Sequence, residues 1–261
     1  MMKRGLLVGK FYPPHHGHHF LIHTARAQVD ELHVIVCGKP EQQPSGALRA
    51  AWLREIHPDV RVMLIDDTLD PDDSQLWADH SIRWLGFAPD LVFSSEDYGD
   101  RFARYLGCQH IQVDKARQAV PMSGTQVRAD PWACWEFIEP PVRGYYAWRV
   151  CLVGAESTGK TTLAQALAAH YHTLWVAEYG REYTELKLAA SAGDHWTSPE
   201  FTHIATIQCE RENAAARQCN RLLICDTDAF ATAIWHRRYL HQRSPAVETI
   251  AARQRRPDLY L

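Results

Sequence analysis

Several features that mark particular classes of protein are absent from this sequence of 261 residues. No apolar run approaches the ~18 residues that a membrane-spanning helix needs. The N-terminal residues hold two cations and one short apolar stretch before the chain reaches Pro13, Pro14 and a cluster of histidines, so we expect no signal peptide. The sequence also has no internal repeat and no low-complexity tract, which argues against solenoid and disordered proteins.

Paired cysteines are absent as well. The seven cysteines are scattered along the chain, odd in number and never spaced as C-x-x-C. This distribution argues against a disulfide framework and against a zinc ribbon. We therefore expect the protein to work in a reducing cytoplasm.

The chain has no excess of charge of one sign. Residues 1–148 hold 15 cations and 19 anions, and residues 149–261 hold 13 and 12, for a formal net charge of −3. Neither half has the basic excess of a nucleic-acid-binding protein, so we expect no nucleic-acid partner and no membrane partner. The 46% of hydrophobic residues is enough for one or two sizeable cores.

Short apolar runs alternate with longer helical patterns in the first half of the chain. The runs that predict β-strands are Gly5–Val8, Leu32–Cys37, Val60–Ile65, Leu91–Phe93 and His110–Val113. Helical patterns lie between them at His18–Ala27, Ala47–Ile56, Leu76–Leu85 and Asp100–Leu106. This alternation predicts an α/β fold class, with a parallel sheet covered by helices on both faces.

The alternation pauses at Glu139-Pro140-Pro141-Val142-Arg143-Gly144, a composition typical of an interdomain linker. A second series follows, with a helix from Lys160 to about Tyr171 and predicted strands at Arg149–Val153, Leu174–Ala177, Leu222–Cys225 and Asp258–Leu261. We therefore predict a first domain over residues 1–138, a linker over 139–148 and a second domain over 149–261.

The first predicted strand leads into Gly9-Lys10-Phe11-Tyr12-Pro13-Pro14-His15-His16-Gly17-His18. His15 and His18 can share one face of an incoming helical turn, where free N–H groups suit a phosphate. Gly17 leaves space for a ligand to approach the backbone. Two other interpretations stay open: a histidine-rich surface loop, and a metal site that would need further ligands.

The string H-x-G-H after a first strand, with G-x-F-x-P upstream, resembles the nucleotidyltransferase superfamily that moves adenylyl groups. That superfamily pairs this motif with S-x-T-x-x-R near the end of its Rossmann-like fold, and this chain has Ser123-Gly124-Thr125-Gln126-Val127-Arg128 at that place. The resemblance is most specific to NMN adenylyltransferases of the bifunctional NadR type. Phe93-Ser94-Ser95-Glu96-Asp97-Tyr98-Gly99 resembles the segment that lines their nicotinamide nucleotide pocket.

This resemblance implies that the 5′-phosphate of NMN attacks the α-phosphorus of ATP and expels pyrophosphate, with Mg²⁺ on the ATP phosphates. It implies catalytic roles for His15, His18, Lys10 and Arg128. It implies further ATP contacts by Gly9, Phe11, Tyr12, Gly17, Ser123 and Thr125. Nicotinamide contacts would come from Trp77, Glu96 and Tyr98, although Trp77 is equally compatible with a core or surface aromatic.

A second constellation, Gly154-Ala155-Glu156-Ser157-Thr158-Gly159-Lys160-Thr161, matches the P-loop pattern G-x-x-x-x-G-K-S/T between a predicted strand and helix. Lys160 is expected to reach the transferring phosphate, and Thr161 to ligate Mg²⁺. The ATP contacts predicted here are Gly154, Glu156, Ser157, Thr158, Gly159, Thr161 and Thr162. Asp226 ends an apolar strand and is a candidate Mg²⁺ ligand or catalytic base, with a helix N-cap as the alternative.

This second half resembles the ribosylnicotinamide kinase domain of the NadR family. The resemblance implies substrate contacts by Glu178 and Arg181, for which an exposed helix start is the alternative. The chain departs from the family in having no room for a helix-turn-helix before its first strand. It also lacks the family's arginine-bearing lid and last elements after Asp258–Leu261, so we expect an impaired kinase, with Arg253, Arg255 and Arg256 at the far end of that strand from the phosphates.

The sequence therefore predicts a two-activity enzyme that makes NMN from nicotinamide riboside and NAD from NMN. Its partners would be the small molecules NMN, ATP and nicotinamide riboside, and a homo-oligomer stays open. A module that senses NAD or ATP without turnover is the rival prediction. A DNA-binding repressor is a third, which the charge balance disfavours.

Overall fold

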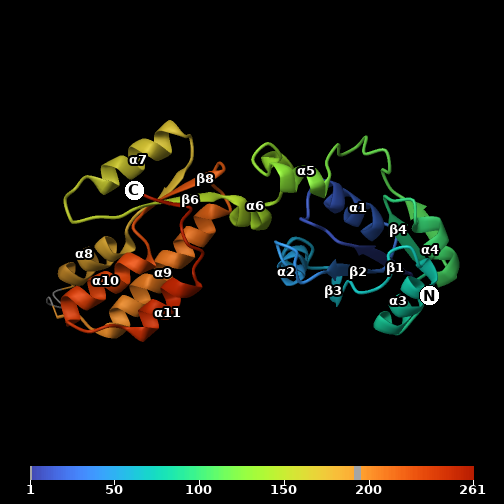
Figure 1. Ribbon diagram of the computed structural model, residues 1–261, viewed down its shortest axis with the longest axis horizontal. Coiled ribbons are helices and arrows are strands. Elements are labelled where there is room, and N and C mark those ends of the chain that lie inside the picture. Colours follow the sequence, from blue (N-terminus) through green and yellow to red (C-terminus); the bar gives the residue numbers. More distant parts are fainter. Residues whose placement is uncertain (1, 191–194) are drawn as a thin grey trace. The chain divides into compact units, whose positions relative to one another are not determined.

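The computed structural model describes residues 2–190 and 195–261. The backbone divides into two compact units, Met1–Val142 and Arg143–Leu261 (Figure 1). Within the described part of the chain, every helix is too short or too polar to span a bilayer.

The first unit is built on a five-stranded parallel sheet with the order β3-β2-β1-β4-β5. Its strands are β1 Arg4–Gly9, β2 Glu31–Gly38, β3 Arg61–Asp66, β4 Leu91–Ser94 and β5 Gln109–Gln112. Its helices are α1 His16–Arg26, α2 Gly46–Ile56, α3 Ser74–Leu85, α4 Gly99–Leu106, α5 Gly124–Ala129 and α6 Pro140–Tyr146, and α6 continues into the second unit.

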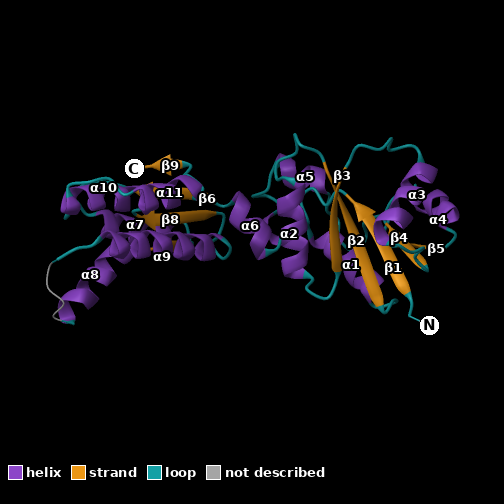
Figure 2. Cartoon of the chain, turned by 90° about the horizontal axis from the view of Figure 1, so that it is seen from below, coloured by secondary structure: helices purple, strands orange, loops and turns teal. Residues whose placement is uncertain are grey.

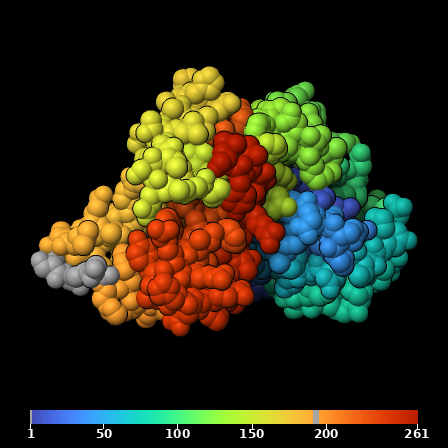
Figure 3. Space-filling model, turned by 60° about the vertical axis from the view of Figure 1, so that its left-hand side comes forward, coloured from blue at the N-terminus to red at the C-terminus, as the bar shows by residue number. Residues whose placement is uncertain are grey.

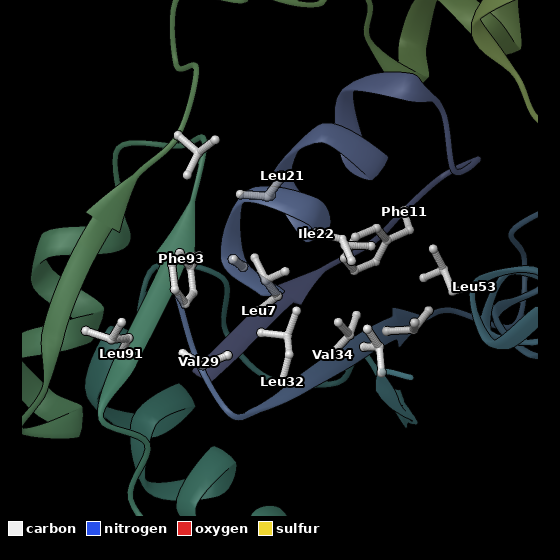
Figure 4. Packing of buried hydrophobic residues seen from close by; sticks show 14 of the residues in the cluster. Leu7, Phe11, Leu21, Ile22, Val29, Leu32, Val34, Leu53, Leu91 and Phe93 are labelled. Carbon is white, nitrogen blue, oxygen red and sulfur yellow. The ribbon is translucent and has the colours of Figure 1, made fainter. Parts of the chain in front are cut away.

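Helices cover both faces of this sheet (Figure 2). On one face, α1 and α2 pack on the strands through a cluster that includes Leu7, Ile22 and Leu53 (Figure 4). On the other face, α3 and α4 contribute Ala78 and Phe102 to a second cluster. Both clusters are almost fully buried, so the sheet is a rigid platform for the loops that follow its strands.

The strand order reverses direction between β1 and β4. The chain winds from β1 outward to β2 and β3, and then returns to the other side of β1 through β4 and β5. The loops after β1 and β4 therefore diverge and leave a crevice at the carboxyl ends of these strands. Ligands of open parallel sheets bind in this crevice.

The second unit has a four-stranded parallel sheet with the order β7-β8-β6-β9. Its strands are β6 Trp148–Leu152, β7 Leu174–Val176, β8 Leu222–Asp226 and β9 Leu259–Tyr260. Its helices are α7 Lys160–His170, α8 Tyr179–Ala189, α9 Ser198–Ala216, α10 Ala229–Leu240 and α11 Pro245–Arg253. The edge strand β9 is exposed at the surface, in the dark red segment of Figure 3.

The structure confirms the α/β class and places all nine predicted strands within one residue of their expected ends. The boundary between the two units lies within residues 139–148, which the sequence predicted as a linker, and α6 occupies most of this range. Proline is tolerated in the first turn of a helix, where its missing N–H has no intrahelical partner, so Pro140 and Pro141 begin a helix here and do not prevent one. Buried Val142 anchors α6.

Candidate functional sites

A cavity of about 740 Å³ lies at the carboxyl ends of β1 and β4 in the first unit. It is lined by every candidate residue that the sequence assigned to this unit. The phosphate-site candidates that line it are Gly9, Lys10, Phe11, Tyr12, His15, Gly17, His18, Ser123, Thr125 and Arg128. The nicotinamide candidates Trp77, Glu96 and Tyr98 line the same cavity.

His15 is the N-cap of α1. Its extended backbone precedes the first helical turn, and its Nδ1 accepts a hydrogen bond from the Gly17 backbone N–H at 3.1 Å. A neutral imidazole that accepts at Nδ1 carries its proton at Nε2. His15 therefore has one N–H donor left for a ligand in the cavity.

The rings of His15 and His18 are in contact, with centroids 3.9 Å apart and planes tilted by 38°. Burial lowers the pKa of His15 to about 4, helped by the nearby charge of Arg117. Burial also lowers the pKa of His18 well below its usual value, and His15, His19 and Arg117 add to the effect. Both rings are thus neutral near pH 7, and His18 Nδ1 is buried without a protein partner. They can act as hydrogen-bonding groups, while the positive charge of the site must come from other residues.

The two phosphate motifs meet on one wall of the cavity. Arg128 Nη1 donates to the Tyr12 carbonyl oxygen at 2.5 Å, and the Arg128 guanidinium lies 4.4 Å from the centre of the Tyr12 ring. A Cβ on Gly124 would lie only 2.4 Å from that same carbonyl oxygen, so only glycine permits this approach. Ser123 caps α5 by accepting from the Gln126 N–H, which places Thr125 and Arg128 toward the first loop.

Arg49 is a functional candidate that the sequence did not reveal. Its side chain is fully buried, and it donates to the Lys10 and Cys37 carbonyls and to Gln42 Oε1. Its guanidinium also lies 4.9 Å from the centre of the Tyr12 ring. A buried arginine saturated with backbone acceptors fixes the loop after β1 in place. Its only signal in the sequence was an arginine among the apolar residues of the first two turns of a predicted helix.

Arg117 is a second residue that sequence reasoning missed. It lines the cavity, lies 3.7 Å from Glu96, and is close enough to lower the pKa of both His15 and His18. The Asp114 carboxylate accepts from the backbone N–H groups of residues 118, 119 and 120, which shapes the loop that carries Arg117. Together with Lys10, which lies 4.0 Å from Asp67, and with Lys39 and Arg128, it gives the cavity wall four cations.

The polar groups of the two aromatic nicotinamide candidates, Trp77 and Tyr98, are hydrogen-bonded to backbone carbonyls. The Trp77 indole N–H donates to the Asp70 carbonyl at 3.0 Å, and the Tyr98 hydroxyl donates to the Val8 carbonyl at 2.9 Å. Burial raises the pKa of Tyr98, so its hydroxyl stays protonated. Both rings also pack on the α3–α4 cluster, so each combines a core contact with a place in the cavity wall.

The P-loop of the second unit follows β6 and is exposed from Gly154 to Gly159. Gly159 is the N-cap of α7 with φ +89°, a conformation that suits glycine. Lys160 Nζ donates to the Gly154 and Ala155 carbonyls at 3.1 and 2.7 Å, and Thr158 Oγ1 donates to the Ala155 carbonyl. Glu156 and Ser157 lie on this loop, and exposed Thr162 lies in the first turn of α7.

Asp226 lies beside this loop at the carboxyl end of β8. Thr161 Oγ1 donates to Asp226 Oδ2 at 2.5 Å, while Asp226 Oδ1 is buried without a protein partner. A buried carboxylate oxygen next to a hydroxyl is a donor set that hard divalent cations prefer. The structure brings together Thr161 and Asp226, the two residues that the sequence assigned to metal binding.

Glu178, at the N-cap of α8, is close to the same group of residues. Burial raises its pKa, and the charge of Asp226 raises it further. Arg181 lies 3.9 Å from Glu178 and is exposed. Arg255 donates to the Tyr145 and Ala147 carbonyls just before β6, so it lies at the opposite end of the sheet from the P-loop, as predicted.

A separate cavity of about 470 Å³ in the second unit lies among α9, α10, α11 and β9. Its wall includes Glu212, Asp228, Phe230 and Tyr260. It contains no residue of the P-loop and neither Thr161 nor Asp226.

Family comparisons divide the chain as the structure does. The cytidylyltransferase-like family matches residues 6–130, and the AAA domain family matches residues 149–261. The trifunctional NAD biosynthesis/regulator protein NadR of Escherichia coli (strain K12) is 29% identical over 94% of this chain, which spans 65% of that protein's length. The nicotinamide-nucleotide adenylyltransferase of Methanospirillum hungatei is 26% identical over 54% of this chain, which covers 84% of that protein.

The fold of the chain is also similar to that of solved structures. A crystal structure of NadR in complex with NR has a TM-score of 0.80 at 23% identity and covers 99% of this chain and 78% of its own. A second, in complex with NAD and AMP-PNP, has a TM-score of 0.78 at 23% identity and covers 100% and 80%. The chain is therefore a nucleotidyltransferase-like unit followed by a P-loop unit.

Proposed function

We propose, because this chain is NadR-like in sequence and in fold, that its first unit transfers the adenylyl group of ATP to NMN. The products are NAD and pyrophosphate. The observation that carries this proposal is the junction of Tyr12 with Arg128 and Gly124, which puts both phosphate motifs on one wall of one cavity. The sequence likeness to a nicotinamide-nucleotide adenylyltransferase over 54% of the chain supports the choice of substrate.

The reaction exchanges one phosphoanhydride bond for another. An oxygen of the NMN 5′-phosphate bonds to the α-phosphorus of ATP as the bond from that phosphorus to the β-phosphate oxygen breaks. Both reactants are anions, so the protein must hold them together and neutralise the charge that develops. No covalent intermediate with the protein is needed.

The cavity divides this work between neutral and charged groups. Lys10, Arg117 and Arg128 supply positive charge for the phosphates. His15 and His18, held neutral by burial, supply N–H donors that can stay hydrogen-bonded to the phosphate oxygens in the transition state. Trp77, Glu96 and Tyr98 lie in the wall that would hold the nicotinamide ring.

We propose a second activity, phosphorylation of nicotinamide riboside by ATP, for the P-loop unit. Its support is the intact P-loop together with Asp226, whose Oδ1 faces no protein partner beside Thr161. Thr161 and Asp226 would hold Mg²⁺, which neutralises phosphate charge when bound. Lys160 would leave its loop carbonyls for the phosphates, and Asp226 or Glu178 would accept the proton of the attacking hydroxyl.

Two assays on the purified chain test these proposals. NMN with MgATP should yield NAD and pyrophosphate in equal amounts, and nicotinamide riboside with MgATP should yield NMN. A module that only senses nucleotides would bind NAD or ATP and form neither product. We also propose that the enzyme works in the reducing cytoplasm, since all seven of its cysteines are free thiols.

A further inference from the structure

Three side chains from different elements form a hydrogen-bonded chain behind the cavity wall. Ser94, at the end of β4, has its Oγ 2.9 Å from His110 Nε2 in β5. His110 Nδ1 lies 2.7 Å from Asp100 Oδ1 in α4. None of the three belongs to the phosphate motifs of either unit.

The middle of this series of hydrogen bonds, at His110 and Ser94, is buried away from solvent. The His110 side chain is 6% exposed and Ser94 is 2% exposed, whereas the Asp100 side chain is 87% exposed. A Cβ on Gly99 would lie 2.2 Å from His110 Nε2 and 2.5 Å from Ser94 Oγ, so Gly99 closes directly over the pair. The hydrogen bonds thus connect the exposed carboxylate of Asp100 to the buried hydroxyl of Ser94 beside the cavity.

The carboxylate sets the direction of the hydrogen bonds. An ionised carboxylate only accepts, so His110 carries its proton on Nδ1 toward Asp100. Nε2 is then an acceptor, and the Ser94 hydroxyl proton points to it. Ser94 Oγ is left to accept from the Glu96 N–H at 3.4 Å. With the opposite tautomer, Nε2 would donate to Ser94, whose proton would turn to the Glu96 carbonyl at 3.2 Å.

Ser94 begins the segment 94–98, which forms one wall of the cavity. Ser94, Ser95, Glu96 and Tyr98 all line it. The segment is held at its start by Ser94 and at its end by the bond from the Tyr98 hydroxyl to the Val8 carbonyl. The orientation of the Ser94 hydroxyl therefore sets the backbone of Glu96 in the wall where the mononucleotide would lie.

We propose that Asp100, His110 and Ser94 are positioning residues that fix the segment 94–98 for binding the mononucleotide. This inference rests on the proposed adenylyl transfer to NMN. This hydrogen-bonded trio, Asp100, His110 and Ser94, is here called the relay. It affects the binding of NMN and not of ATP, because the phosphate motifs lie on other elements, after β1 and in α5. Ser94 has the hydrogen-bonding pattern of an activated nucleophile, but its position under Gly99 and its 2% exposure assign it a positioning role.

The decisive variant is Asp100→Asn, because this exposed side chain can be changed without opening the core. An asparagine can donate to Nδ1 and so permits the opposite tautomer of His110. We expect the KM for NMN to rise about 10-fold, the size of effect typical of lost outer-shell partners, with the KM for ATP and the melting temperature unchanged. Asp79→Asn, which changes an exposed aspartate in α3, is the matched control and should alter nothing.

A double-mutant comparison shows whether Asp100 acts through Ser94. Ser94→Ala should raise the KM for NMN by a similar factor, and adding Asp100→Asn to it should cause no further rise. If the two substitutions raised the KM for NMN additively, or raised the KM values for NMN and ATP equally, the proposed action of Asp100 through Ser94 would be overturned. Release of p-nitrophenol from p-nitrophenyl acetate that Ser94→Ala abolishes would also overturn it, since that would make Ser94 a nucleophile.

A second readout does not depend on turnover. Nitrogen-15 NMR should find His110 protonated at Nδ1 in the wild type and at Nε2 in Asp100→Asn. Calorimetry should show weaker NMN binding for the variant. A wild-type chain that neither binds NMN nor forms NAD overturns the proposed function and this inference together, whereas wild-type turnover with an unchanged KM in both variants overturns the relay alone.

Discussion

Two neutral histidines line the same cavity as the cations Lys10, Arg117 and Arg128, and the two kinds of group have different parts in the proposed reaction. Charge on a phosphate is present before and during the reaction, so Lys10, Arg117 and Arg128 help binding as well as rate. A hydrogen bond donated by His15 or His18 strengthens most where new negative charge develops in the transition state. Residue-level variants should separate these two kinds of contribution.

His18→Ala tests the donor role. We expect kcat for NAD synthesis to fall by a factor on the order of 10²–10³ with little change in the KM for NMN, because the lost interaction strengthens in the transition state. Steady-state kinetics measures both constants. His80→Ala is the control, since His80 lies on α3 and is not part of the cavity wall. Wild-type turnover by the His18 variant would refute the assignment.

Buried histidines also make stability depend on pH. Burial lowers the pKa of His15 to about 4, of His57 to about 4 and of His19 to about 3, and His19 Nδ1 lies 2.8 Å from His57 Nε2. Below about pH 6.5 the unfolded chain binds a proton at each of these residues, while the folded chain does not until the pH nears 4. The free energy of unfolding should therefore fall as the pH is lowered from about 6.5 to about 4.

Urea unfolding of the whole chain between pH 7 and 4.5 measures this loss. Each histidine contributes at most about 1.4 kcal/mol per pH unit. His57→Gln removes one of these groups and relieves its partner His19, so its stability should depend less steeply on pH. A wild-type urea midpoint that stays constant over this range would contradict the proposed state of the buried rings.

At the scale of elements, the site depends on how closely α5 approaches the loop after β1. Gly124→Ala would place a methyl group against the Tyr12 carbonyl oxygen, and α5 would have to move away with Arg128. We expect a stability loss of about 1–3 kcal/mol and a fall in NAD synthesis of about 10-fold or more. Thermal unfolding and steady-state kinetics on the same preparation measure both.

Gly86→Ala is the matched control for that variant. Gly86 ends α3 with φ +79° and has open space around its Cβ position. The left-handed conformation should cost about 1–2 kcal/mol of stability and leave kcat and KM unchanged. If both glycine variants lose stability and activity in the same proportion, close approach of α5 is not what the reaction requires.

At the scale of the whole molecule, each compact unit carries its own candidate phosphate-binding residues. Lys160→Ala should abolish phosphorylation of nicotinamide riboside and leave NAD synthesis from NMN near the wild-type rate, because Lys160 Nζ donates to carbonyls of its own P-loop. His18→Ala should do the reverse. Coupled assays of both variants provide mutual controls, and a folded Lys160 variant that cannot make NAD would show that the two activities share a site.

Local patterns in the sequence were enough for the nine strands, for helices α1 to α4 and α7, and for the motif residues, whereas α6 and α8 to α11 were not predicted. Alternating apolar runs predicted the strands, and glycine, proline and histidine spacing predicted the two phosphate loops, because these signals depend on neighbours a few positions apart. Composition did not reveal the local structure of the predicted linker at residues 139–148, where the pair Pro140-Pro141 begins α6. Proline is compatible with both structures, so composition alone does not separate them.

The sequence by itself determined the fold class, the division into two α/β units and the candidate residues of both phosphate loops. Only the tertiary structure decided which distant residues act together. Arg49 beneath Tyr12, Arg117 beside His15 and the chain from Asp100 through His110 to Ser94 join residues on separate elements. Their meeting depends on the strand order β3-β2-β1-β4-β5, and burial in that arrangement sets which groups are charged. Neither strand order nor burial can be derived from the spacing of residues along a single chain.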